Sequence, residues 1–263
     1  MIFLCILICL LSTMVGAVSG IGGGVIIKPM LDLTLPALGM TKVSFLSACA
    51  VCSMALFSVI RNRFQATPQP IEMKIAVPLG AGSVLGGTLG KALFQNVSAA
   101  LNADTAVKLV QNAVLLALML IVTVGAFKKK EEAAPKARAP WKGFALGLLC
   151  GGLSAFLGIG GGPFNMLILT GFFGMTHKKG ALYSLFVIVF SQAAGIVTAC
   201  ISGSALPGAT WILGVCLAGI GGGVIGRALA KKMQNRAVKM LYGAALIFII
   251  LLCAFNIVHS LIH

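Results

Sequence analysis

The residues best suited to chemistry in this sequence form two glycine clusters, Gly20-Ile21-Gly22-Gly23-Gly24 and Gly158-Ile159-Gly160-Gly161-Gly162, and each interrupts an apolar stretch. Glycine accepts positive φ angles, so a run of it ends a helix and leaves backbone N–H groups unpaired. The N-terminus of a helix carries about half a positive charge and favours anions. We therefore predict that the backbone at the following positions binds an anionic solute: Gly22, Gly23, Gly24, Gly160, Gly161 and Gly162.

Polar side chains after each cluster are the second group of candidates for substrate binding: Lys28, Ser47, Asn165, Ser184 and Gln192. Lysine supplies a positive charge, and the amides and hydroxyls supply hydrogen-bond donors. Two alternatives stay open. Lys28 could mark the boundary of a segment, and serines in membrane helices commonly donate to their own backbone.

Signatures of catalysis are missing from the sequence. It has no nucleophile-and-base arrangement, no zinc-binding helix motif and no phosphate-loop lysine. All five acidic residues fall at segment ends or in loops, whereas membrane carriers of protons or sodium place carboxylates inside the membrane. We predict a protein that is not an enzyme, needs no metal or cofactor, and handles an anion.

The composition requires an environment of lipid. Of the 263 residues, 59% are hydrophobic and 10% are charged, whereas a soluble domain has about 25% charged residues. The net charge of +15 is spread over short clusters between apolar runs, which is typical of cytoplasmic loops near anionic lipids and not of a nucleic-acid-binding face. Runs of near-spanning length occur at 2–19, 43–60, 73–94, 106–127, 143–158, 181–201, 209–229 and 238–258.

The two halves of the chain repeat each other. Besides the glycine clusters, Gly39-Met40-Thr41-Lys42 matches Gly174-Met175-Thr176-His177, and Gly86-Gly87-Thr88-Leu89-Gly90-Lys91-Ala92-Leu93 matches Gly222-Gly223-Val224-Ile225-Gly226-Arg227-Ala228-Leu229. Matches in the same order along both halves indicate an internal duplication.

Equivalent loops of the halves carry opposite charge bias. Arg61, Arg63 and Lys74 flank one loop, while its counterpart at 202–208 has no charge. This predicts inverted-topology repeats in an all-α membrane protein, each a glycine-broken re-entrant hairpin followed by three transmembrane helices. The expected parts are a first repeat at 1–127, a basic cytoplasmic linker at 128–142 and a second repeat at 143–263, with both termini external.

Duplicated halves that open with Gly-Ile-Gly-Gly-Gly, the first followed by Lys28-Pro29, resemble the sulfite exporter TauE/SafE family from about Met14 to Ile257. The resemblance implies secondary transport of a small sulfur-containing anion, such as sulfite or a sulfonate, across the cell membrane. The alternative is a non-transporting membrane subunit or scaffold whose glycines serve helix packing. The sequence assigns no particular anion, no direction of transport and no oligomeric state.

Overall fold

The computed structural model describes residues 1–64, 69–101, 104–128, 140–157, 160–201 and 206–262, and all regular elements in this part of the chain are helices. Each half contains a first helix of 18 residues, a short helix, and three long helices in that order. The bounds are α1 Ile2–Ser19, α2 Gly24–Thr34, η1 Pro36–Leu38, α3 Gly39–Arg63, α4 Met73–Leu101, α5 Asp104–Lys128, α6 Pro140–Leu157, α7 Gly162–Gly171, α8 His177–Ile201, α9 Ala209–Lys232 and α10 Asn235–Ile262.

Both glycine clusters break the helices as predicted. Gly20 ends α1 with a φ of 79°, and α2 begins directly after Gly23, which is also left-handed with a φ of 79°. In the second half α7 begins after Gly161 with the same φ of 79°, and Pro163 occupies its first turn. A side chain is disfavoured in this conformation, and proline is tolerated where the N–H is unpaired anyway. Gly158 and Ile159 lie outside the described residues.

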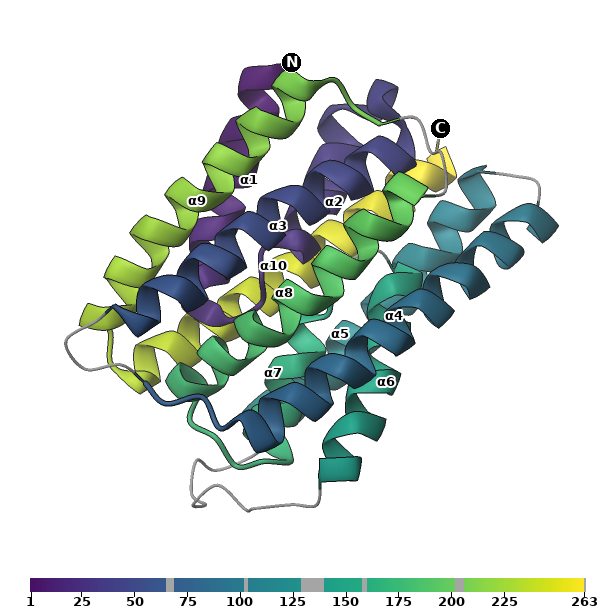
Figure 1. Cartoon of the computed structure of the whole chain (residues 1–263). Helices are drawn as coiled ribbons and strands as arrows, with labels where there is room; N and C mark the ends of the chain where they lie inside the picture. Colours follow the sequence, from purple (N-terminus) through teal and green to yellow (C-terminus); the bar gives the residue numbers. More distant parts are fainter. Residues whose placement is uncertain (65–68, 102–103, 129–139, 158–159, 202–205, 263) are drawn as a thin grey trace.

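Helices of the first half pack against helices of the second half in a symmetric pattern. The most extensive contact joins α4 of the first half to α6 of the second, and the next joins α9 to α1. The equivalent contacts α3–α9 and α4–α8 follow, with α3–α8 between the halves. As a result α9, α3, α8 and α4 lie side by side across the molecule (Figure 1).

Glycines make the α4–α6 contact close. A methyl group at Gly82 would overlap the carbonyl of Phe144, and one at Gly147 would overlap that of Leu79. Gly86 and Gly151 face carbonyls of the opposite helix in the same way. These four glycines serve close helix packing, because the two backbones touch where side chains are missing.

The ends of the bundle differ in charge. The two termini lie at the same end (Figure 1). Basic segments gather at the opposite end. There Lys178 Nζ donates to the carbonyl of Met233 over 3.1 Å, and Lys179 pairs with Glu72 over 3.0 Å. These bonds join the beginnings of α4 and α8 to the end of α9, at the opposite end of the bundle.

Several helices of the described chain are long and apolar enough to cross a membrane. They are α1, the segment Pro36–Arg63, α6, α8, α9 and, in α10, Asn235–Val258. The predicted all-α membrane protein is confirmed to this extent. The inverted orientation of the repeats stays a prediction. The second repeat was expected to begin at 143, and α6 begins slightly earlier, at Pro140; positions 129–139 of the linker lie outside the described residues.

Candidate functional site

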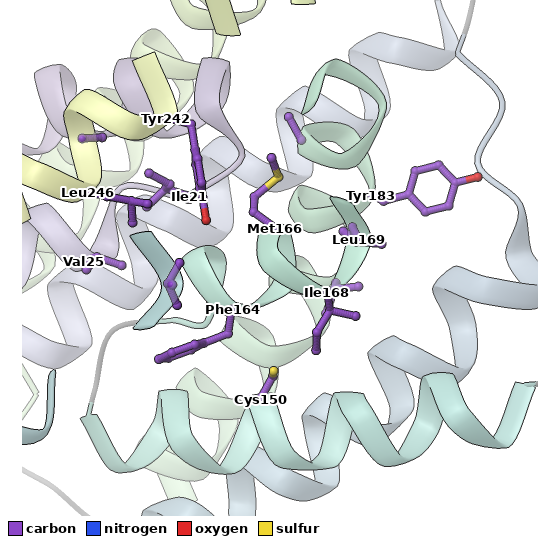
Figure 2. Packing of buried hydrophobic residues seen from close by; sticks show 14 of the residues in the cluster. Ile21, Val25, Cys150, Phe164, Met166, Ile168, Leu169, Tyr183, Tyr242 and Leu246 are labelled. Atoms are coloured by element: carbon purple, nitrogen blue, oxygen red, sulfur yellow. The ribbon is translucent and has the colours of Figure 1, made fainter. Parts of the chain in front are cut away.

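The two glycine breaks meet in the centre of the molecule. Gly162 has no side chain, and a methyl group there would overlap the backbone carbonyl of Ile21. Ser184 of α8 donates its hydroxyl to the carbonyl of Gly20 over 2.6 Å, which fixes the end of α1. Ile21 belongs to the same buried cluster as Phe164 and Met166 of α7 (Figure 2). Segments about 140 positions apart thus share one core, as two half-helices meeting at a central site require.

The end of α6 is capped by side chains from the first half. Lys28 Nζ donates to the carbonyl of Leu157 over 3.0 Å and to Oε1 of Gln111 over 3.2 Å. Gln111 Nε2 in turn donates to the carbonyl of Phe156 over 2.8 Å. The last carbonyls of a helix carry partial negative charge and have no partner within the helix. Lys28 and Gln111 therefore satisfy the end that the second glycine break creates.

A cavity of about 530 Å³ lies beside this cap, between helices of both halves. Its lining includes two lysines, Lys28 of α2 and Lys91 of α4. Hydroxyl and amide side chains supply the other polar groups in the wall: Thr41, Ser44, Thr88, Gln111, Ser154, Ser191, Gln192 and Thr198.

The cavity runs from an exposed rim to a buried floor. Thr41 and Thr88 at the rim are exposed, whereas Lys28 is 6% and Ser154 4% exposed. None of the described lining residues is acidic. Asp32 lies one turn beyond Lys28 on α2, within electrostatic reach of its ammonium group, and offsets part of one charge. The wall therefore combines two cations with neutral donors, which suits a small anion.

Comparison with protein-family models identifies the family to which the chain belongs. The model of the sulfite exporter TauE/SafE family matches residues 5–252, nearly the whole length. The chain belongs to the TauE/SafE family. It is therefore a multi-pass membrane protein of a transporter family and not an enzyme, as the sequence predicted. Comparisons with curated proteins and with solved structures gave no match.

The candidate residues of this TauE/SafE protein fall into two groups. Lys28, Gly160 and Gln192 line the cavity. The others lie outside its lining, and all of them are buried: Gly22, Gly23, Gly24, Ser47, Gly161, Gly162, Asn165 and Ser184. The backbone of the first break packs against α1, α3 and α8. Of the six candidate glycines, Gly160 alone reaches the cavity wall. A direct role of the rest in binding stays a prediction.

Sequence reasoning missed several residues of this wall. The sequence motifs include Lys91 only within the duplicated segment, and they do not include Gln111. Both are polar residues inside apolar runs, at 73–94 and 106–127, and such residues in a transporter commonly line the solute path. A polar residue inside an apolar run therefore marks a candidate, but helix packing decides which of these side chains face one cavity.

Proposed function

We propose that this TauE/SafE protein is a secondary transporter of a small sulfur-containing anion, such as sulfite or a sulfonate, across the cell membrane. The observation that carries the proposal is the cavity between the halves, whose described wall holds Lys28 and Lys91 and no carboxylate. A buried cation attracts an anion far more strongly than one in water, because the surroundings screen the charge poorly.

The floor of the cavity has the capacity to bind an oxyanion directly. The ammonium group of Lys28 has three N–H donors, of which two are engaged by Leu157 and Gln111. The third N–H serves the anion, with the side-chain amide of Gln192 in the same cavity wall. A volume of 530 Å³ falls in the range of small-molecule sites, roughly 300–1,000 Å³, so sulfite enters with part of its water.

Inverted repeats provide the route across the membrane. In the proposed topology α1–α2 forms a hairpin that starts and ends outside, α6–α7 forms one that starts and ends in the cytoplasm, and three helices span the membrane after each. Both termini are external, and the basic end of the bundle contacts anionic lipid on the cytoplasmic side. The repeats at 1–127 and 143–263 then rock about the central site to open it to either face.

The packing role of glycine does not account for the cavity. Glycines between α4 and α6 explain how those helices approach, which a scaffold would also need. A scaffold has no need for two lysines in a cavity that reaches the protein's centre. Transport therefore explains more of the structure than a non-transporting role.

The test is flux in reconstituted vesicles with labelled sulfite, thiosulfate, taurine and sulfoacetate. We expect uptake of at least one anion. Lys91→Gln is expected to raise its KM about tenfold, since loss of one partly desolvated charge contact is worth about 1.4 kcal/mol. Lys74→Gln is the matched control, because Lys74 is exposed at the opposite end of the same helix.

Folded protein that carries none of the four anions would overturn the proposed substrate class. An equal effect of the Lys74 and Lys91 substitutions would show that total charge, and not the cavity, governs the flux.

A further inference from the structure

The duplicated segment places a second cation at the position equivalent to Lys91. Gly90-Lys91-Ala92-Leu93 of α4 corresponds to Gly226-Arg227-Ala228-Leu229 of α9. The two helices occupy equivalent places, because α4 packs on α6 and α8 while α9 packs on α1 and α3. Lys91 lines the cavity, and Arg227 occupies the equivalent position in the second half of the chain.

Arg227 is buried, and its guanidinium group is not fully hydrogen-bonded. Its side chain is 7% exposed, and its Nε has no hydrogen-bond partner in the described chain. Arg61, one turn after Ser58 on the packed helix α3, carries the same charge and repels Arg227. A buried charge is costly unless it is paired, and two cations that face each other add to the cost. An anion between them would remove both penalties.

The arginine pair and the cavity rim lie at opposite ends of the bundle. Thr41 at the rim and Arg61 are both on α3, about twenty positions apart, which corresponds to roughly 30 Å along the helix axis. Arg227 lies near the end of α9, beside the same end of α3. A distance of this size is close to the thickness of the hydrocarbon core of a membrane.

Equivalent positions are open at one end and closed at the other. A methyl group at Gly87, one turn before Lys91, would meet no atom within 4 Å. At the equivalent Gly223, one turn before Arg227, it would lie 3.2 Å from the carbonyl of Met54 and 3.3 Å from the hydroxyl of Ser58. The face of α4 that carries Gly87 is thus open, whereas the equivalent face of α9 is closed against α3, as two states of one repeated element would be.

We propose that Arg227 and Arg61 form a second anion-binding site, which takes the same small oxyanion at the end opposite the cavity rim when α9 and α3 separate there. A guanidinium presents two parallel N–H groups that match two oxygens of an oxyanion. The site rests on the proposed function, since it is the counterpart of the cavity in the other state of the transporter.

The experiment measures the KM for labelled sulfite, or for the anion carried best, from each face separately in right-side-out and inverted vesicles. Arg227→Gln is expected to raise the KM at least tenfold at the face that carries Arg227 and less than twofold at the cavity face. Lys91→Gln is expected to do the reverse. Arg227→Lys keeps the charge but not the paired N–H groups, so its KM is expected between those of the wild type and the glutamine variant.

Arg236→Gln is the matched control: the same change at an exposed arginine at the same end of the molecule, with no change of KM at either face. If Arg227→Gln fails to fold, Arg61→Gln keeps the test valid, because Arg61 is only half-buried and is expected to give the same one-sided rise. Equal effects on both faces, or none, would overturn the second site and leave transport intact. Wild-type vesicles without flux would overturn the proposed function and the second site together.

Discussion

At the scale of single residues, Lys28 has two roles: it stabilises the end of a helix, and it contributes charge to the proposed binding site. Its ammonium group caps α6 through Leu157 and also lines the cavity. The same atom therefore contributes to stability and to the charge of the site. Gln111 caps the neighbouring carbonyl of Phe156 but brings no charge. Substitutions at these two positions separate the two contributions.

Lys28→Met is expected to lower both stability and anion affinity. The carbonyl of Leu157 would lose its donor in an apolar environment, which costs about 1–3 kcal/mol. Gln111→Leu is expected to give a similar loss of stability through Phe156, with a smaller loss of affinity because the positive charge remains. Thermal unfolding in detergent and sulfite binding by calorimetry measure the two effects. An equal loss of affinity in both variants would contradict a charge-based site.

At the scale of elements, backbone contacts determine how the helices associate. Lipid is as apolar as leucine, so helices in a membrane associate through close packing and polar contacts. In α4 the glycines at 82, 86 and 90 each face a carbonyl of α6, whereas Gly87 on another face meets nothing. Neighbouring glycines of one helix thus have different roles.

Gly86→Ala is expected to destabilise the protein, because the added methyl group would overlap the carbonyl of Leu148 and force the helices apart. Overpacking of this kind costs about 1–3 kcal/mol. Gly87→Ala is expected to be neutral or stabilising by up to about 1 kcal/mol, since alanine favours a helix over glycine. Melting temperatures of the two variants in the same detergent provide the comparison, and equal values would refute the assigned contact.

The two glycine breaks allow a second comparison, between glycines that share a left-handed backbone conformation but differ in their surroundings. Gly23 and Gly160 both have positive φ, which costs an alanine about 1–2 kcal/mol. A methyl group at Gly23 would also lie 2.8 Å from the carbonyl of Ser12, which is fixed in a helix, whereas at Gly160 it would meet only the amide end of Gln192.

Gly23→Ala is therefore expected to lower the melting temperature more than Gly160→Ala. The latter is expected to change anion affinity instead, because it displaces Gln192 in the cavity wall. The two readouts are thermal unfolding and sulfite binding. A larger loss of stability at Gly160 would contradict the packing described for the breaks.

At the scale of the whole molecule, charge orients the bundle. Termini lie at one end, and the segments with Arg61, Arg63, Lys178, Lys231 and Lys232 lie at the other. Cytoplasmic loops of membrane proteins carry the excess of lysine and arginine. The cavity rim shares the end of the termini, so the same rule predicts a rim that faces outward.

A reporter fused after His263 is expected to read as external, and one inserted in the linker at 129–139 as cytoplasmic. Alkaline phosphatase and green fluorescent protein fusions measure the two locations, because each is active on one side only. Cys200 gives a control in the native chain, since it is the exposed cysteine among those described and lies at the end of α8. Its labelling by an impermeant maleimide from outside should agree with the reporter; a cytoplasmic reading after His263 would overturn the topology.

Features that depend on local chemistry can be predicted from the residue types. Glycine clusters stop helices wherever they occur, so the breaks, the short helices after them and the capping place of Pro163 could be predicted from residue types. Composition required a membrane, and the repeated segments indicated two halves of equal element order.

The set of residues that share a site depends instead on how the helices pack. Lys28, Lys91 and Gln111 come from three helices, and their meeting beside the end of α6 depends on how those helices pack across the halves. The same packing buries Ser184 and Asn165 away from the cavity and leaves Arg227 enclosed. Local residue types determine where a helix breaks, whereas the direction a side chain faces depends on the rotation of each helix against its neighbours, and this rotation is set by contacts between distant segments.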